Sequence, residues 1–337
     1  MINKKNSTFV FISVGALCLL AAMILAATGT KVGKTYTNPV LVETVIINRI
    51  APDNFNGVLG IGDPSVLFHN GSYYLYPTGD NHGYDVYVSK DLVNWQKGSR
   101  VFKSDEPGVW APDVFYNETD RTFYLYYTVN GRIGVAIADQ PDGIFKDHGT
   151  LIDKAIDAHM FVDEDGSYYL YYVEYPGFRI HVQPMASPIQ KKGEPVRLIQ
   201  AADAWEKKQA SLTEAPWMLK HNGVYYLLYS ASGANTQEYA IGYATSKSPL
   251  GPFTKYDGNP IMKKGAGIFG PGHCSVTKAA DGKLWMVYHQ QKNSKRGWNR
   301  IICIDPLRFD EKGVLHGKAT RGETRAAPEV FRLKAGG

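Results

Sequence analysis

The sequence predicts an all-β protein, a five-bladed β-propeller with four antiparallel strands in each blade. One observation is a pattern of roughly fifty residues that occurs five times, a period typical of propellers and solenoids. A second is that the turns inside this pattern are typical of β-hairpins. A third is the composition, because 34 Gly and 18 Pro residues are too many and too evenly scattered for an all-helical protein.

Each copy of the pattern contains a leading polar residue, a short strand, a turn and a second strand that is usually rich in tyrosine. The copies are DPSVLFHNGSYYLYPTG from Asp63, APDVFYNETDRTFYLYYTVN around Asp113, DAHMFVDEDGSYYLYYVE from Asp157, TEAPWMLKHNGVYYLLYSAS around Glu214 and GHCSVTKAADGKLWMVYHQQ around His273. These five leading residues are 50, 44, 57 and 59 positions apart. The pattern therefore predicts five hairpins, one in each blade.

Turn residues and two further strand candidates complete each blade. Four hairpins contain strong turn signals, at Asn70–Gly71, Asp165–Gly166, Asn222–Gly223 and Asp281–Gly282. The further strand candidates are residues 84–91 and 95–102, 131–139 and 144–152, 178–185 and 195–201, 239–246 and 252–257, and 299–310 and 314–321. Five blades then occupy residues 60–325. A β-sandwich with accidental regularity is the alternative, but it does not account for polar residues at the same phase of five hairpins.

The segments outside the blades have separate interpretations. Residues 1–30 place Lys4 and Lys5 before an uncharged apolar run and small residues, which is typical of a secretory signal peptide. An uncleaved N-terminal anchor is the alternative, because the run approaches the length that spans a bilayer. Either reading predicts a secreted or periplasmic protein. Residues 31–59 form a lead-in segment, and residues 326–337 form a C-terminal tail.

Charge and short motifs exclude several classes of function. The formal net charge is +5, and Lys4 and Lys5 contribute two of these charges, so +3 remains, which is too little to indicate nucleic-acid binding. The chain has no glycine-rich phosphate loop that opens a helix, no zinc-ligand spacing and no nucleophile elbow. Outside the leader only Cys274 and Cys303 occur, so one bridge is arithmetically available but no disulfide framework exists.

The phase of the repeats predicts the site. The innermost strand of each blade runs beside the axis, so residues at its start converge at one mouth of the channel. Asp63, Asp113, Asp157, Glu214 and His273 are therefore expected to lie together. Like charges and partial burial separate the pKa values of neighbouring carboxyl groups, so that one stays protonated while another is ionised. Paired carboxyl groups in such a pocket are the equipment of glycoside hydrolysis.

An aromatic residue near this mouth supports a sugar substrate. Trp110 lies close in sequence to Asp113, and the face of an indole ring can stack on a sugar ring. Asp63 precedes Pro64, which favours extended backbone at Asp63. Glu214 lies ahead of apolar residues, so partial desolvation should keep its carboxyl group protonated near neutrality.

Five stretches of the chain resemble glycoside hydrolase family 43, whose members are five-bladed propeller arabinofuranosidases, xylosidases and arabinanases. The stretches are GIGDPSVLF, WAPDVFY, IDAHMFVDEDGSYYLYY, LTEAPWMLKHNGVYYLLYS and GPGHCSV, in the family's order. The resemblance implies that Asp63 is the general base, Glu214 the general acid and Asp157 the carboxylate that orients the acid. It implies that His273 touches substrate or holds a structural calcium ion through water. Arg300 matches an arginine placed near the acids.

These expectations describe an inverting glycosidase that needs no cofactor. Its partner is an oligosaccharide or polysaccharide of plant type with arabinofuranosyl or xylosyl linkages, and Trp110, Asp113, His273 and Arg300 contribute to binding it. A galactan-directed enzyme of the same family is an alternative. A non-catalytic propeller that binds glycan or protein is another, although it would not need three carboxylates. A propeller that transfers sugars to acceptors or to phosphate is a third. The sequence leaves both exo and endo action open, and it does not indicate an oligomeric state.

Overall fold

The structure is a computed structural model that describes residues 34–50 and 55–331. The expected leader, residues 1–30, and positions 332–337 of the expected tail lie outside the described residues. All strands belong to one compact unit, Thr35–Gly337. Within the described ranges, no helix has the length and apolar character needed to cross a membrane.

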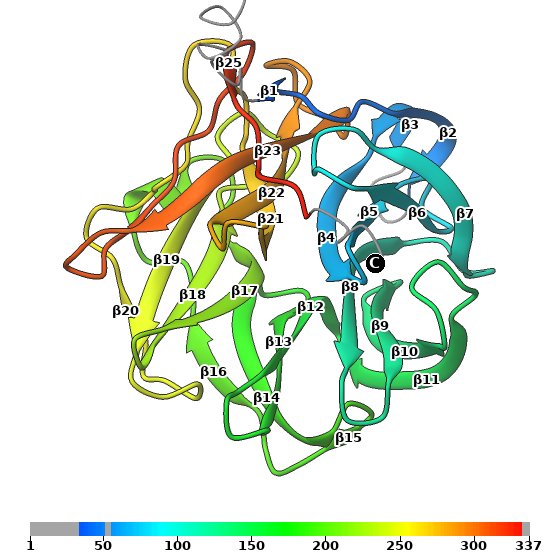
Figure 1. Cartoon of the computed structure of the whole chain (residues 1–337). Helices are drawn as coiled ribbons and strands as arrows, with labels where there is room; N and C mark the ends of the chain where they lie inside the picture. Colours follow the sequence, from blue (N-terminus) through cyan, green and yellow to red (C-terminus); the bar gives the residue numbers. More distant parts are fainter. Residues whose placement is uncertain (1–33, 51–54, 332–337) are drawn as a thin grey trace, which may run out of the picture. The chain divides into compact units, whose positions relative to one another are not determined.

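Five small antiparallel sheets follow one another around a common centre, so the predicted five-bladed propeller is confirmed (Figure 1). Blade 1 contains β4 (Gly62–His69), β5 (Ser72–Thr78), β6 (Gly83–Ser89) and β7 (Gln96–Lys103). Blade 2 contains β8 (Val109–Asn117), β9 (Thr122–Val129), β10 (Arg132–Ala138) and β11 (Lys146–Asp153). Blade 3 contains β12 (Ala155–Val162), β13 (Tyr168–Glu174) and β14 (Arg179–Ser187), and its outer edge is divided between β15 (Gln190–Lys191) and β16 (Val196–Ile199).

The remaining two blades repeat the arrangement. Blade 4 contains β17 (Thr213–His221), β18 (Val224–Ala231), β19 (Ala240–Ser246) and β20 (Thr254–Lys255). Blade 5 contains β21 (Gly272–Lys278), β22 (Leu284–Gln291), β23 (Arg300–Phe309) and β24 (Leu315–His316). A short 3-10 turn, η1 (Ala204–Lys207), lies between blades 3 and 4. The first strands of the blades (β4, β8, β12, β17 and β21) contact their neighbours in a closed ring around the axis.

The tyrosines of the repeat fasten neighbouring blades together. Their rings are buried between the sheets, and at least one hydroxyl group crosses each of the five blade boundaries to a backbone carbonyl. The bonds are Tyr76 to Pro141 (2.6 Å), Tyr126 to Pro188 (2.8 Å), Tyr171 to Pro249 (2.8 Å), Tyr226 to Gly313 (2.7 Å) and Tyr73 to Lys278 (3.0 Å). A tyrosine ring fills the apolar interface while its hydroxyl group satisfies a carbonyl. The tyrosine-rich strands are thus explained by packing between blades.

The lead-in segment pairs with a strand from late in the described chain and contacts blade 5. In it β1 (Thr35–Thr37) pairs with β25 (Thr324–Ala326), and β2 (Thr44–Ile50) pairs with β3 (Phe55–Gly60). The Asn38 side chain exchanges hydrogen bonds with the backbone of Ile304 in β23, at 2.7 and 2.9 Å. Beside it, the buried Asp305 accepts hydrogen bonds from Tyr36, Tyr288 and Thr320. We call these contacts around Asp305 the closure network.

Every first strand contains an irregularity near its start. The pairing shifts between Gly62 and Ser65, Trp110 and Asp113, Ile156 and His159, Glu214 and Trp217, and Gly272 and Cys274. Within each shift one residue has a positive φ: Asp63 (47°), Ala111 (42°), Asp157 (55°), Ala215 (54°) and His273 (46°). β-bulges of this kind redirect a side chain next to functional sites. The extended backbone expected at Asp63 is therefore wrong, because the bulge overrides the preference imposed by Pro64.

The bulges also correct the expectation that the five leading residues share one phase. Asp63, Asp157 and His273 occupy the bulge position itself. Glu214 lies one residue before the bulge of blade 4, whereas Asp113 lies two residues after the bulge of blade 2. A difference of two residues in a strand moves a side chain several ångströms along the axis.

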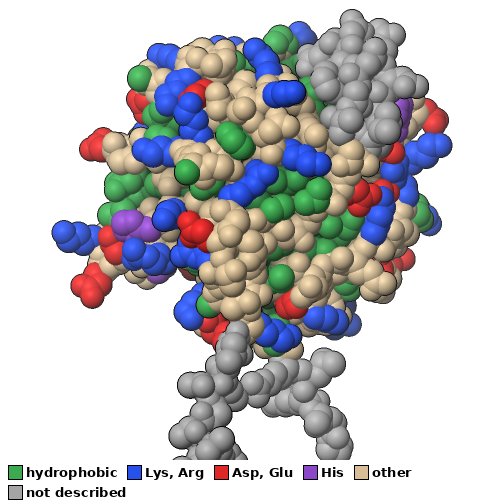
Figure 2. All heavy atoms as spheres, turned by 90° about the horizontal axis from the view of Figure 1, so that it is seen from above, with side chains coloured by type: hydrophobic (Ala, Val, Ile, Leu, Met, Phe, Trp, Pro, Cys, Tyr) green, Lys and Arg blue, Asp and Glu red, His purple; other side chains and the backbone are tan. Residues whose placement is uncertain are grey.

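The two cysteines of the blades are free. Cys274 and Cys303 are buried in the apolar core between blades 4 and 5 and form no disulfide. One face of the molecule is mixed in character, since Figure 2 shows cationic and anionic side chains spread over it among polar and apolar groups.

Candidate active site

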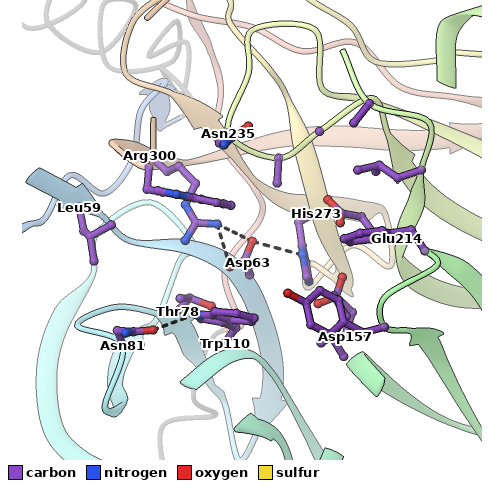
Figure 3. A pocket seen from close by; sticks show the side chains of 18 of the residues that line it. Leu59, Asp63, Thr78, Asn81, Trp110, Asp157, Glu214, Asn235, His273 and Arg300 are labelled. Atoms are coloured by element: carbon purple, nitrogen blue, oxygen red, sulfur yellow. Dashed lines mark hydrogen bonds and ion pairs between the residues drawn. The ribbon is translucent and has the colours of Figure 1, made fainter. Parts of the chain in front are cut away.

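A cavity of about 300 Å³ opens where the first strands begin. Six of the residues predicted from the sequence line it: Asp63, Trp110, Asp157, Glu214, His273 and Arg300. Figure 3 shows Asp63 between Arg300 and His273, with Asp157 and Glu214 on the other side of His273. Residues from all five blades therefore meet in one cavity.

Asp63 is paired with a buried arginine. The Arg300 Nη1 donates to both carboxylate oxygens, at 2.7 and 2.8 Å, and the Arg300 side chain is only 3% exposed. Burial by itself would raise the pKa of Asp63, but Arg300 and His273 hold that pKa well below its usual range. A Cβ atom on Gly62 would lie 2.4 Å from the Arg300 Cζ, so only glycine leaves room for this pair. Asp63 is thus held ionised.

Two histidines contact Asp63 in different protonation environments. The Nδ1 of His273 lies 3.2 Å from Oδ1 of Asp63, and this carboxylate raises the pKa of His273 against the opposing effect of burial. His289 accepts a hydrogen bond at Nδ1 from the backbone N–H of Asp63, at 3.1 Å. Burial and the Arg300 charge hold the pKa of His289 well below its usual range, so it stays neutral. The sequence pattern did not reveal His289, because it lies on β22, the second strand of its hairpin, whereas the pattern points to the start of the first strand.

Glu214 and Asp157 form the opposite side of the cluster of carboxyl groups. Burial raises the pKa of Glu214 to about 8, and the charge of Asp157 adds to this effect. Burial also raises the pKa of Asp157 to about 6. Asp157 accepts a 3.0 Å hydrogen bond from the backbone N–H of Ala215, the residue that follows Glu214. At pH 7 the cavity therefore contains an ionised Asp63 and a protonated Glu214.

Tyr239 is a neighbour of Glu214 that the sequence did not reveal. The buried Oε1 of Glu214 and the hydroxyl of Tyr239 have no hydrogen-bond partner of standard geometry, although the two groups are close enough for each to shift the other's pKa. The Tyr239 ring stacks on His289 with centroids 5.6 Å apart. A Cβ atom on Gly272 would lie 1.9 Å from this ring, which explains the second glycine of the GPGHCSV stretch.

Aromatic side chains form part of the wall. The Trp110 Nε1 donates to Oδ1 of Asn81 at 2.8 Å, and its ring meets the edge of Tyr175 with centroids 6.4 Å apart. Trp298 lies under the guanidinium of Arg300, 5.3 Å from ring centroid to Cζ. These partly exposed rings border the carboxylates and give a sugar ring apolar surfaces to contact.

Asp113 is placed elsewhere and does not line the cavity. It accepts hydrogen bonds from Ser65 Oγ at 3.1 Å and from the backbone N–H of Met160 at 2.8 Å, and it lies 3.3 Å from Nδ1 of His159. These contacts join β4, β8 and β12 below the bulges. The side chain holds three blades together near the axis.

A calcium ion at His273 has few protein ligands available. In the ranges 34–50 and 55–331 no three His, Cys, Asp or Glu side chains are grouped to hold one metal ion. The Nδ1 of His273 faces Asp63, whose oxygens are already engaged by Arg300. Calcium prefers six to eight oxygen ligands, so an ion here would depend on water. Such an ion remains a prediction.

Comparison with known proteins gives a consistent result. The profile of the family described as "Glycosyl hydrolases family 43" matches residues 59–315. Beta-D-galactofuranosidase xynD of Aspergillus niger is 29% identical over 75% of this chain and 81% of its own length. Arabinoxylan arabinofuranohydrolase of Bacillus subtilis is 28% identical over 86% of this chain and 65% of its own length.

A solved structure agrees with these relatives. The crystal structure of a thermostable family-43 glycoside hydrolase superimposes with a TM-score of 0.76 and 36% identity, over 88% of this chain and all of that one. The family profile, over residues 59–315, spans Asp63, Asp157, Glu214, His273 and Arg300. The chain belongs to glycosyl hydrolase family 43.

Proposed function

We propose that this glycosidase cleaves arabinofuranosyl or xylosyl linkages of plant-type polysaccharides or oligosaccharides with inversion at the anomeric carbon. One observation carries the mechanism: a single cavity contains a carboxylate with a lowered pKa, Asp63, and a carboxyl group with a raised pKa, Glu214. A base and an acid separated in this way can act together at neutral pH.

Glu214 serves as the general acid. Its proton passes to the glycosidic oxygen as the bond to the anomeric carbon breaks, so the leaving group departs as a neutral alcohol. Asp63 serves as the general base and takes a proton from the water that attacks the opposite face of the sugar. The products are the inverted sugar, the alcohol, an ionised Glu214 and a protonated Asp63. Exchange of one proton with solvent then restores both groups.

Asp157 acts as a positioning residue. Its hydrogen bond to the Ala215 N–H fixes the backbone next to Glu214. Its negative charge also raises the pKa of Glu214 and so helps to keep the acid protonated. Arg300 has the corresponding effect on Asp63, because two hydrogen bonds hold the base ionised and in one orientation.

A galactofuranosyl linkage is the second candidate substrate, because the Aspergillus niger relative is named a galactofuranosidase. Arabinofuranose and galactofuranose share the five-membered ring, so one cavity could accept either at the cleaved bond. We also propose that the enzyme acts outside the cytoplasm, on the basis of residues 1–30.

Two measurements test this function. Nitrophenyl α-L-arabinofuranoside, β-D-xyloside and β-D-galactofuranoside, together with arabinan, xylan and galactan oligomers, identify the sugar released. Proton NMR of the first-formed anomer identifies the stereochemistry. We expect arabinose or xylose to be released with inversion. Glu214→Gln serves as the inactive control on the oligomers, which have no aryl leaving group. Retained configuration would remove the role assigned to Asp63.

A further inference from the structure

The loop between β22 and β23, residues 292–299, carries three cations without an acidic residue. Lys292, Lys295 and Arg296 are exposed, and none of them forms an ion pair with any other part of the described chain. We call these three side chains the cationic rim.

The loop that carries the rim reaches the cavity through Arg296 and is held in place by hydrogen bonds. Arg296 itself lines the cavity. The loop is fixed by a hydrogen bond from the Gly297 N–H to the Asn235 carbonyl at 2.9 Å, and Asn235 is another lining residue. At the start of the loop, the Arg321 Nη2 donates to the Lys292 carbonyl at 2.9 Å. The charge of Arg296 is therefore positioned beside the space that a substrate would occupy, and Lys292 and Lys295 belong to the same exposed loop.

Three other arginines at this end of the propeller are neutralised by carboxylates. Arg100 pairs with Asp80 at 2.7 Å. Arg132 pairs with Glu106 at 2.8 Å, and Arg179 pairs with Glu174 at 2.6 Å. Arg296 differs from them because no carboxylate in the described structure is its partner. An arginine of this kind has its full hydrogen-bonding capacity available for a ligand.

The chemistry of the rim and of the cavity restricts where a negative group could bind. Arginine binds carboxylates through two parallel hydrogen bonds, while lysines add point charges nearby. Deep in the cavity, the buried guanidinium of Arg300 is already paired with Asp63, so it offers no unpaired positive charge to an anionic sugar. A negative group is therefore favoured at the rim and disfavoured at the cleaved sugar.

We infer that the substrate is an acidic glycan, in which a uronic acid residue next to the cleaved sugar places its carboxylate on Arg296, with Lys292 and Lys295 nearby. The inference rests on the proposed function and narrows its substrate class. The sugar to be released is neutral and occupies the cavity, and the acidic residue lies outside it. Steering of such a polymer by the rim should be strongest at low ionic strength.

Binding can be measured without turnover in Glu214→Gln. At pH 6 this substitution preserves the charge of the cavity, because the pKa of Glu214 is about 8. Calorimetry would compare neutral arabino- and xylo-oligosaccharides with the same chains carrying one glucuronosyl or galacturonosyl residue. We expect the acidic member of a pair to bind about fivefold more tightly at low salt, as for an exposed ion pair, and the ratio to approach one in about 0.5 M NaCl.

Arg296→Gln provides the specific test, and Arg308→Gln is its matched control. Arg308 is also an exposed arginine of blade 5 without an ion pair among the described residues. It lies eight positions after Arg300 in β23, roughly 26 Å along the strand at about 3.3 Å per residue. Arg296→Gln should remove most of the acidic preference, whereas Arg308→Gln should retain it.

Three results would overturn the inference: equal Kd values for neutral and acidic ligands, no binding by either, or equal loss in the two arginine variants. Failure of the proposed function has a different signature. In that case wild-type enzyme releases no sugar from any member of the panel, whatever the ligand preference of Glu214→Gln. The kcat/KM values of wild-type enzyme on the neutral and the acidic member of each oligosaccharide pair give a second measurement. We expect the same ratio and the same salt dependence as for binding.

Discussion

Asp63 and Asp305 are both buried carboxylates, 7% and 0% exposed, yet their surroundings differ in kind. Asp63 faces a cation, the Arg300 guanidinium, which lowers its pKa in spite of burial. Asp305 lies in the closure network among neutral donors, including the Tyr36 and Tyr288 hydroxyls. Burial raises the pKa of Asp305, and these donors only oppose that effect.

The strand β23 connects the two environments, because Arg300 and Asp305 both belong to it. Neutral hydrogen-bond donors satisfy a buried carboxyl group and hold chain segments together. A buried cation does more, because it keeps the carboxylate ionised and available as a base. Burial of an acid is therefore insufficient to indicate catalysis, and the charge of its partners distinguishes the two regions.

Replacement of each aspartate by asparagine should give the largest difference in kcat between the two regions. Asp63→Asn should lower kcat by about 10²–10⁴-fold, since water loses its general base. Asp305→Asn should leave kcat at 25 °C near the wild-type value, because the closure network lies outside the cavity. Steady-state kinetics on the best substrate measures both. A large loss of kcat in an Asp305→Asn variant that is fully folded would contradict the separation of the two regions.

Glu214→Gln should show an equally large loss that depends on the leaving group. Nitrophenyl and natural glycosides require protonation of the departing oxygen to different extents, and dinitrophenyl glycosides need very little. The kcat ratio between wild type and variant should therefore fall sharply on dinitrophenyl substrates. Asp63→Asn should show no such recovery, because water must be activated whatever group departs. Identical behaviour of the two variants would reverse or remove the assigned roles.

The sequence predicts much of this fold and part of this site. The five-bladed arrangement follows from the turn residues of the hairpins and from a pattern of roughly fifty residues that occurs five times. Asp63, Asp157 and Glu214 could be found because they stand at strand starts within recognisable stretches. Asp113 could not be placed correctly, because the bulge in β8 adds a residue that side-chain alternation does not show.

Other residues of the site carry no sequence signal of their own. His289 and Tyr239 come from β22 and the segment before β19, where no repeated polar position distinguishes them. Their importance is visible only in three dimensions, because each contacts a carboxyl group that the first strands provide. The pairing of β1 with β25 is equally hidden, since two three-residue strands at opposite ends of the chain have no detectable pattern.

The acid should also weaken the fold as pH rises. The folded-state pKa of Glu214 is about 8, above its ordinary value of 4.5, so between these values the folded protein binds the extra proton. The contribution of Glu214 to the free energy of unfolding is then fully present below pH 4.5. It falls by up to about 1.4 kcal/mol per pH unit between pH 4.5 and pH 8. Glu214→Gln should be more stable than wild type, with a difference that grows from pH 5 to pH 8. Urea unfolding across this range measures it, and a constant difference would contradict the raised pKa.

Asp157→Asn should shift the pH profile more than it lowers the maximal rate. The wild-type basic limb of kcat/KM should lie near pH 8, where Glu214 loses its proton. Removal of the neighbouring negative charge should move this limb to lower pH by roughly one unit. Asparagine retains an oxygen that can accept the hydrogen bond from the Ala215 N–H. An unchanged limb with a reduced kcat would mean that Asp157 acts through geometry alone.

Calcium should have the smallest effect of all, and only in the region of Asp63. His273 offers nitrogen to a cation that prefers oxygen, so we expect affinity no tighter than the millimolar range. At a calcium concentration equal to Kd, binding stabilises the fold by about 0.4 kcal/mol, which corresponds to roughly 1 °C in Tm. EDTA should therefore change Tm slightly and leave most turnover intact, with magnesium added back as the control for ionic strength. If EDTA abolishes turnover while circular dichroism shows an intact fold, a metal ion acts in catalysis beside Asp63, and Arg300 cannot be the only cation that tunes the base.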